Sequence, residues 1–461
     1  MGGATASQLA PFVFPGSGEL IHRVFAVALL STVASMTVPT ALSAQAAQAP
    51  ALAYPQAKKV DVVDTQFGVA VADPYRWLEN DVRNDKEVEA WVTAQNQVTD
   101  AFLQKLPLRD WFKQRMTALY DYERFGLPVK RGKTYFHTHN SGLQNQSVLF
   151  VRHGLNGQSR QLIDPNSWSK DGATALAEWT PSEDGKLLAY AVQDGGTDWR
   201  TVKVMDVATG KIRSDEIKGM KYSGGVSWAK DGSGFYYSRY PLPDAKATFQ
   251  NATLNHKVYF HKLGTKQAAD RLVYSTPSNP KLSHYPQVSD DGRWLMIYTS
   301  LAGDENDLHV VDLKKPGSKP IAMFTGLKNQ WGVIGNEGSR FYLLTDKDAP
   351  LKQVVAADAL KRVAPVTIIP EGKQALDNVS LIGGKLIASY LVTRRARRRF
   401  TTSPARSCRP SRCPASAPLA VSTARATIRR PSSPSPASIG RPASIATTRC
   451  PDRRRHGLRR S

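Results

Sequence analysis

The stretch Ser182-Glu-Asp-Gly-Lys-Leu-Leu-Ala-Tyr-Ala-Val192 holds the pattern that decides the fold. An acidic residue and a glycine form a turn, and a strand of apolar and aromatic residues follows it. Similar turns recur at Arg131-Gly132, Asp184-Gly185, Asp231-Gly232, Asp291-Gly292, Glu337-Gly338 and Gly383-Gly384. Their glycines are 53, 47, 60, 46 and 46 residues apart. Units of about fifty residues with about four strands each are typical of β-propeller blades.

Several units continue in the same way, with a strand that ends at an acidic residue before a second turn. Val202-Lys-Val-Met-Asp206 precedes Thr209-Gly210, and Leu308-His-Val-Val-Asp312 precedes Pro316-Gly317. A β-sandwich with coincidental turns would not explain the regular spacing. We therefore expect a mainly β chain with a propeller over residues 126–392, in about six blade units. The last unit, counted from Gly384, is interrupted after one strand, at Val392.

Two helices are expected before the propeller, within residues 50–125. From Asn84 to Leu106, Val88, Trp91, Val92, Gln95, Val98 and Phe102 recur at helical spacing. Asn84 with Glu87 resembles a capping box, and Pro107 ends the element. A second helix is expected from Leu108 to Tyr120.

Residues 1–49 have the features of an export signal. His22-Arg23 precedes an apolar run from Val24 to Val38 and then a stretch of small residues ending at Ala49. That order is typical of a secretory signal peptide, and the run is shorter than the roughly 20 residues that span a bilayer. We expect a periplasmic or secreted protein that is free of the membrane after signal cleavage.

Residues 393–461 break with the composition of the rest of the chain. They contain 18 Arg, no Lys and one acidic residue, so they carry +17 of the net charge of +23. They have no apolar periodicity, which predicts a disordered tail. One interpretation is a basic arm that binds nucleic acid or an anionic membrane surface. The favoured one is out-of-frame translation, since a shifted frame of a GC-rich gene yields Arg, Ser, Pro, Ala and Thr. All three cysteines, Cys408, Cys413 and Cys450, lie there, so the body has no disulfide, zinc-cysteine site or cysteine nucleophile.

Several blocks of residues resemble the prolyl oligopeptidase family. Asp73-Pro-Tyr-Arg-Trp-Leu-Glu-Asn80 is similar to the N-terminal signature of that family, and the resemblance runs from about Tyr54 to Val392. Blade segments that are similar to those of the family are Gly142–Leu149, Leu162–Asn166, Ser182–Gly185, Gly196–Trp199 and Asn255–Tyr259.

The resemblance implies a serine-type endopeptidase that cleaves oligopeptides after proline. In that family a seven-bladed propeller gates access to a C-terminal α/β-hydrolase domain, against which the N-terminal helices pack. Its nucleophilic serine lies in a Gly-x-Ser-x-Gly turn. No such motif occurs in this sequence, so we assign no catalytic residue, and we expect a truncated family member that is inactive alone.

Other candidate residues indicate structural roles. His137 and His139 share one strand face, but with no acidic third ligand they predict no metal site. His256 and His261 flank a strand, and a structural role within a blade explains them equally well. Trp179, Trp228 and Trp294 lie beside the blade turns, as core residues between blades do. No cofactor is expected, and the chain is predicted to be a monomer if it folds. The alternatives that stay open are a non-catalytic propeller that binds peptides or other partners and, less favoured, a basic-tailed nucleic-acid binder.

Overall fold

The structure is a computed structural model that describes residues 52–195, 197–221, 225–242, 253–361 and 363–391, and the backbone of 401–404. The predicted signal peptide, the three cysteines and most of the predicted tail lie outside the described residues. Among the residues described, no helix is long and apolar enough to cross a membrane.

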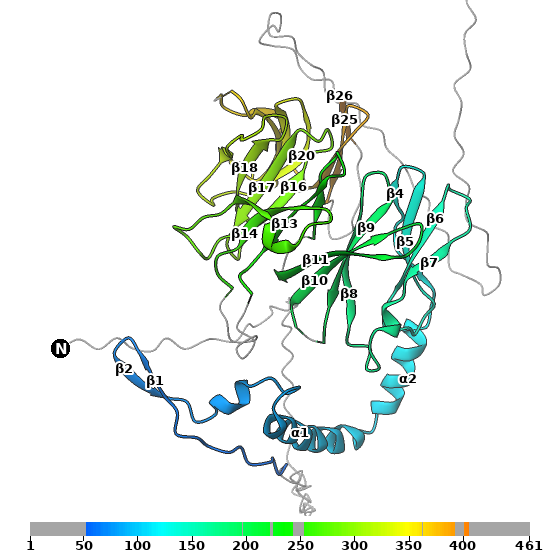
Figure 1. Cartoon of the computed structure of the whole chain (residues 1–461), viewed down its shortest axis with the longest axis vertical. Coiled ribbons are helices and arrows are strands. Elements are labelled where there is room, and N and C mark those ends of the chain that lie inside the picture. The colour runs from blue at the N-terminus through cyan, green and yellow to red at the C-terminus, as the bar shows by residue number, and fades with distance from the viewer. Residues whose placement is uncertain are drawn as a thin grey trace, which may run out of the picture. The chain divides into compact units, whose positions relative to one another are not determined.

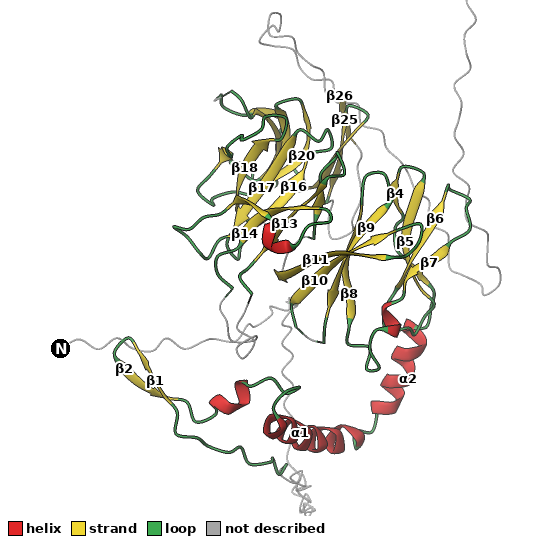
Figure 2. Cartoon of the chain, viewed as in Figure 1, coloured by secondary structure: helices red, strands yellow, loops and turns green. Residues whose placement is uncertain are grey.

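The described chain begins with a hairpin and two helices (Figures 1 and 2). Strands β1 and β2 pair antiparallel, and a short 3₁₀ helix precedes helix α1, which is followed by α2. The bounds are β1 Val63–Gln66, β2 Val69–Ala72, η1 Arg76–Glu79, α1 Lys86–Gln104 and α2 Arg109–Tyr120. Both helices lie within the predicted ranges.

The N-cap of α1 differs from the prediction. Asp85, not Asn84, precedes the first helical residue, and its Oδ1 accepts hydrogen bonds from the N–H groups of Glu87 and Val88 at 2.9 and 3.2 Å. A carboxylate at this position satisfies two free donors and also interacts favourably with the positive end of the helix dipole. Asn84 instead donates its side-chain amide to Asp81 Oδ2.

Six antiparallel sheets follow, which we number I to VI in chain order. Sheet I contains β3 Arg124–Phe125, β4 Val129–Arg131, β5 Thr134–Asn140, β6 Val148–His153 and β7 Arg160–Ile163. Sheet II contains β8 Ala175–Pro181, β9 Leu187–Gln193, β10 Trp199–Asp206 and β11 Ile212–Lys221. Sheet III contains β12 Ser227–Trp228, β13 Gly234–Arg239, β14 Lys257–Lys262 and β15 Arg271–Tyr274.

The remaining sheets repeat this order. Sheet IV contains β16 Ser283–Val288, β17 Trp294–Ser300, β18 Asn306–Asp312 and β19 Ile321–Phe324. Sheet V contains β20 Trp331–Glu337, β21 Arg340–Thr345, β22 Gln353–Asp358 and β23 Val366–Ile369. Sheet VI contains β24 Leu376–Ile382, β25 Lys385–Tyr390 and β26 Thr401–Pro404. Two short 3₁₀ helices, η2 Pro165–Ser167 and η3 Gln267–Ala269, lie in the connections.

Each of the six predicted turns connects two strands that pair within one sheet: β4 and β5, β8 and β9, β12 and β13, β16 and β17, β20 and β21, and β24 and β25. Their glycines at 132, 185, 232, 292, 338 and 384 all have φ between 56° and 72°, a conformation that favours glycine. In each sheet the turn therefore joins two hydrogen-bonded strands of the same blade. The prediction that a unit begins at the turn was wrong on this point, because the strand before each turn belongs to the same sheet.

Sheet VI shows the consequence. Its turn at Gly384 joins β24 to β25, so two strands, not one, lie before Thr393. A third strand, β26, pairs with β25 through Lys385–Ala388 and Thr401–Pro404, and it lies within the segment that the composition assigned to the tail.

Each pair of consecutive sheets shares a buried core. Five apolar clusters bridge sheets I and II, II and III, III and IV, IV and V, and V and VI. Trp228 and Trp294 lie in these clusters, and their indole N–H groups donate to Thr180 O and Gly338 O of the adjacent sheets at 2.9 and 2.7 Å. Trp179 packs against the cluster between sheets I and II. All three tryptophans therefore occupy the predicted positions between blades.

Candidate functional site

His137 and His139 of β5 both contact neighbouring side chains of the described chain. His139 Nε2 lies 2.8 Å from Glu123 Oε1, and its ring stacks on Phe125 at 4.4 Å. His137 stacks against Phe150, and burial, together with the nearby Arg152, lowers its pKa. No group of three or more potential metal ligands occurs among the described residues. Both histidines are structural residues of sheet I.

His261 lies in a buried polar network between sheets II and III. Its ring is fully buried, with Nδ1 2.7 Å from Asp270 Oδ1 and Nε2 3.2 Å from Asp215 Oδ1. Asp215 also accepts hydrogen bonds from Arg213 Nε at 3.0 Å and from the Gly264 N–H, and Tyr237 donates to Asp270 Oδ2 at 2.7 Å. The network joins β11 to β13, β14 and the loop before β15.

Hydrogen bonds stabilise the ionised form of Asp215, which lies on β11 in sheet II. Burial alone would raise the pKa of Asp215, but the hydrogen bonds from Gly264, Arg213 and His261 outweigh it and lower that pKa. Because the side chains of His261, Asp215 and Asp270 are at most 1% exposed, substrate cannot reach them. The network therefore stabilises the fold and is not a catalytic triad.

His256 is another buried histidine. Its ring stacks on Tyr240 at 4.2 Å, and its Nδ1 accepts the N–H of His284 at 2.9 Å. Burial and the charge of His284 lower the pKa of His256 to about 3. The imidazole is therefore neutral and packs as a core residue of sheets III and IV.

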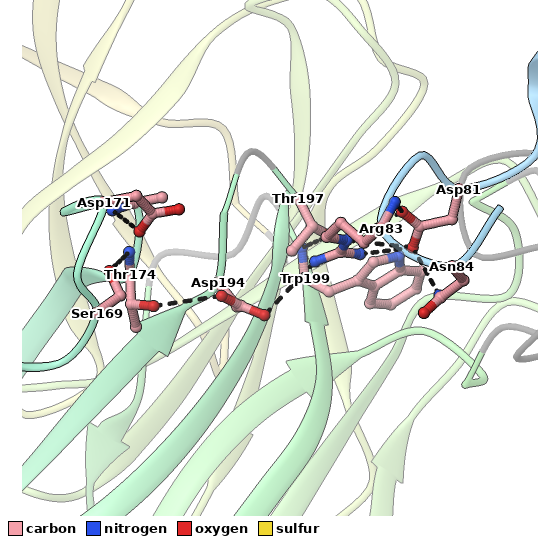
Figure 3. Close-up of polar contacts among 10 residues, drawn as sticks. Asp81, Arg83, Asn84, Ser169, Asp171, Thr174, Asp194, Thr197 and Trp199 are labelled. Carbon is pink, nitrogen blue, oxygen red and sulfur yellow. Dashed lines mark hydrogen bonds and ion pairs between the residues drawn. The ribbon is translucent and has the colours of Figure 1, made fainter. Parts of the chain in front are cut away.

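A group of polar residues that includes the exposed side chains of Arg83 and Asp194 lies at one end of sheet II (Figure 3). Arg83, in the loop before α1, binds Asp81 in bidentate fashion, and its Nη1 lies 3.5 Å from Asp194 Oδ2 in the loop between β9 and β10. Asp194 Oδ1 accepts a hydrogen bond from Thr174 Oγ1 at 3.2 Å. The hydrogen bond to Asp81 is the main cause that raises the pKa of Arg83, and Asp194 adds to it. This contact connects the N-terminal helical segment to sheet II.

A pocket that we call the β8 pocket lies along the first strand of sheet II. Its volume is about 530 Å³, and it is lined by Thr138, Gln146, Ser147 and residues 176–180. Gln146 fixes the entry to β8, because its Nε2 donates to Gly172 O and Thr174 O and its Oε1 accepts the Leu176 N–H. Glu178 pairs with Arg200, and burial raises the pKa of Glu178 although Arg200 opposes that effect.

A second surface feature is apolar and lies on α2. Trp111, Phe112, Met116 and Leu119 are each more than half exposed. A hollow of about 740 Å³ adjoins them, lined by residues 106–109, Phe112, Lys113, Met116 and Thr117. Soluble monomers rarely leave so many large apolar side chains together in water, so this surface is suited to contact another protein surface.

The comparison with protein families identifies the chain. The model of the prolyl oligopeptidase N-terminal β-propeller domain matches residues 54–412. The chain belongs to the prolyl oligopeptidase family. The family match extends past Thr393 and includes β26. This agrees with the pairing of β26 with β25 in sheet VI.

Curated relatives and solved structures of prolyl oligopeptidases give the same result. The prolyl endopeptidase of Elizabethkingia meningoseptica is 37% identical over 74% of this chain and 48% of its own length. The macrocyclase-peptidase POPB of Amanita bisporigera is 31% identical over 73% of this chain and 50% of its own length. A solved prolyl endopeptidase has 41% identity, covers 76% of this chain and 50% of its own, and has a TM-score of 0.56. Prolyl oligopeptidase B of Galerina marginata, solved with a 25mer macrocyclization substrate, has 27% identity, covers 76% and 52%, and has a TM-score of 0.65.

These matches confirm the predicted family and the mainly β propeller fold. The chain spans about half the length of the curated relatives that it matches. Sequence reasoning found the histidines and tryptophans but missed the β8 pocket and the contact between Arg83 and Asp194. Neither has a motif, because each brings together residues from separate loops and strands.

Proposed function

We propose that this propeller controls which substrates reach a serine peptidase domain that cleaves short peptides after proline. Membership of the prolyl oligopeptidase family and the names of the relatives support the substrate class. The resemblance to this family implies that the propeller admits oligopeptides and excludes folded proteins.

The exposed apolar surface of α2 is the observation that carries this proposal. Four large side chains, Trp111, Phe112, Met116 and Leu119, contact little of the described chain. Burial of such side chains stabilises an interface by about 25 cal/mol for each Å² removed from water. An α/β-hydrolase domain that packs on this surface would cover it, as the family resemblance implies.

The chain by itself is expected not to hydrolyse peptides. Acyl transfer by this family requires a serine, a histidine base and an aspartate that orients the base, and the sequence has no Gly-x-Ser-x-Gly. The His261 network is not expected to substitute, because the side chains of His261, Asp215 and Asp270 are at most 1% exposed. Cleavage of a proline p-nitroanilide peptide by the purified full chain, blocked by a serine-directed inhibitor, would contradict this expectation.

The docking surface can be tested with the catalytic half of the Elizabethkingia meningoseptica enzyme. We expect sedimentation velocity to show that this half associates with the full chain, and that Trp111→Lys weakens the association at least tenfold. Gln114→Lys is the matched control, since it adds the same charge to α2 outside the apolar set. Lack of association, or equal effects of the two variants, would contradict the role of α2.

A propeller that binds peptides without catalysis is the second candidate, and the β8 pocket favours it. The nucleic-acid alternative depends on residues 393–461, most of which lie outside the described residues, and it predicts binding that weakens steeply with salt and is lost when that segment is deleted. No binding to DNA or RNA at low salt would remove that alternative.

We also propose that the chain is exported to the periplasm or the medium. N-terminal sequencing of the protein from fractionated cells is expected to show a start between residues 45 and 50. A cytoplasmic protein that retains Met1 would contradict export.

A further inference from the structure

The first strand of sheet II has one unpaired edge within the described residues. The strand order of this sheet is β11-β10-β9-β8, so β8 pairs with β9 on one side only. Pro181 at the end of β8 is consistent with this position, because proline is found mainly on edge strands.

The register shows which backbone groups of β8 face that edge. Ser182 N–H donates to Leu187 O at 2.9 Å next to the turn, and Thr180 and Glu178 lie opposite Ala189 and Ala191. In an antiparallel ladder the hydrogen-bonding direction alternates along the strand, so the N–H and C=O of Trp179 point away from β9.

A bulge interrupts the pairing of β8 two residues before Trp179. The register shifts between Leu176 and Glu178, which leaves Ala177 as the additional residue. The N–H of Leu176 is turned away from β9 and donates to Gln146 Oε1 at 3.2 Å. A side chain thus already binds one group of this edge from outside the sheet. Bulges commonly re-aim groups beside binding sites.

The β8 pocket lies along the same residues. Its volume of about 530 Å³ is in the range of known ligand pockets, and its lining includes the side chains of Thr138, Ser147 and Thr180. Glu178, the charged residue of the lining, pairs with Arg200 through Oε1, and its Oε2 is a buried acceptor without a hydrogen-bond partner among the described residues. These features suit an uncharged, extended backbone better than a charged chain terminus.

We propose that the edge of β8 and the pocket beside it bind an extended peptide by strand addition. The N–H and C=O of Trp179 would bond to the peptide backbone, and the pocket would take one of its side chains. This inference rests on the proposed function, because it assigns a position to the peptide class that the propeller admits.

The test uses the full chain and a capped hexapeptide, acetyl-Gly-Thr-Val-Thr-Pro-Gly-amide, in isothermal titration calorimetry. Two further peptides carry a single N-methyl group, one on the valine and one on the threonine that follows it. In an added strand adjacent N–H groups point in opposite directions, so one N-methyl peptide should lose at least tenfold in affinity and the other should bind unchanged. Equal affinities of the two N-methyl peptides, or no binding of the parent at millimolar concentration, would overturn the inference.

Protein variants identify the site. Ser147→Trp fills the pocket and is expected to weaken binding at least tenfold, whereas Ser159→Trp, at an exposed position before β7 and outside the pocket lining, should leave it unchanged. Equal affinity of the two variants would place the peptide elsewhere and overturn the inference. If this site fails while the catalytic half still associates through α2, the proposed function stands and only the β8 assignment falls.

Discussion

Replacing Tyr237 by Phe removes one oxygen atom from the buried network between sheets II and III. Tyr237 is fully buried, and its hydroxyl donates to Asp270 Oδ2 at 2.7 Å. The Asp270 side chain is 1% exposed, so water cannot replace the lost donor. A hydrogen bond to a charged group contributes about 1.5–3 kcal/mol, and we expect the free energy of unfolding to fall by about that amount.

Tyr342→Phe is the matched control for this prediction. Tyr342 is as buried as Tyr237, and its hydroxyl also donates to a carboxylate, Glu337 Oε2, at 3.0 Å. Glu337 is exposed, so water can solvate it after the change. The expected loss is below about 1 kcal/mol. Urea unfolding at pH 7.5, followed by tryptophan fluorescence, measures both values, and equal losses would refute the argument that the buried acceptor dominates.

Three further predictions test other parts of the structure. Gly185→Ala places a methyl group 2.9 Å from Arg131 O at φ +70°, whereas the methyl group of Gly210→Ala, at φ +73°, meets open space. The positive φ alone should lower the free energy of unfolding of Gly210→Ala by about 1–2 kcal/mol. Urea unfolding should show a larger loss for Gly185→Ala, because the methyl group also crowds Arg131 O. Burial lowers the pKa of His256 to about 3 and that of His284 to about 4, while the unfolded chain binds protons near pH 6.5. The free energy of unfolding should therefore be highest above about pH 6.5 and should fall as the pH decreases toward 3. In thermal melts at successive pH values, His256→Gln should reduce the slope of that fall. Asp194→Asn breaks an exposed ion pair, so the free energy of unfolding obtained from thermal melts should change by less than about 0.5 kcal/mol. A larger loss would show that the contact stabilises more than the local loops.

Much of the fold could be predicted from the sequence because it repeats. Glycines such as Gly185 and Gly292 adopt positive φ at regular spacing, and Trp228 and Trp294 follow the same turns into the core. Local rules were less accurate at Asp85, where two adjacent residues were both good N-caps and only the path of the chain selects between them.

The candidate site could not be predicted, because its parts are far apart in the sequence. Asp215 and His261 are 46 residues apart and meet only when sheets II and III pack. The β8 pocket depends on a bulge at Ala177 that no composition signal marks. The contact of Arg83 with Asp194 joins the helical segment to a loop more than 100 residues later.

Size selection by a chimera tests whether the propeller controls which substrates reach the peptidase domain. In this chimera residues up to Tyr390 replace the matching half of the Elizabethkingia meningoseptica enzyme, and cleavage after proline is measured in a short peptide and in a folded protein with an exposed proline. We expect that the chimera cleaves only the peptide, whereas the catalytic half alone cleaves both substrates. A chimera that cleaves both substrates with the same ratio of kcat/KM values as the catalytic half would contradict it.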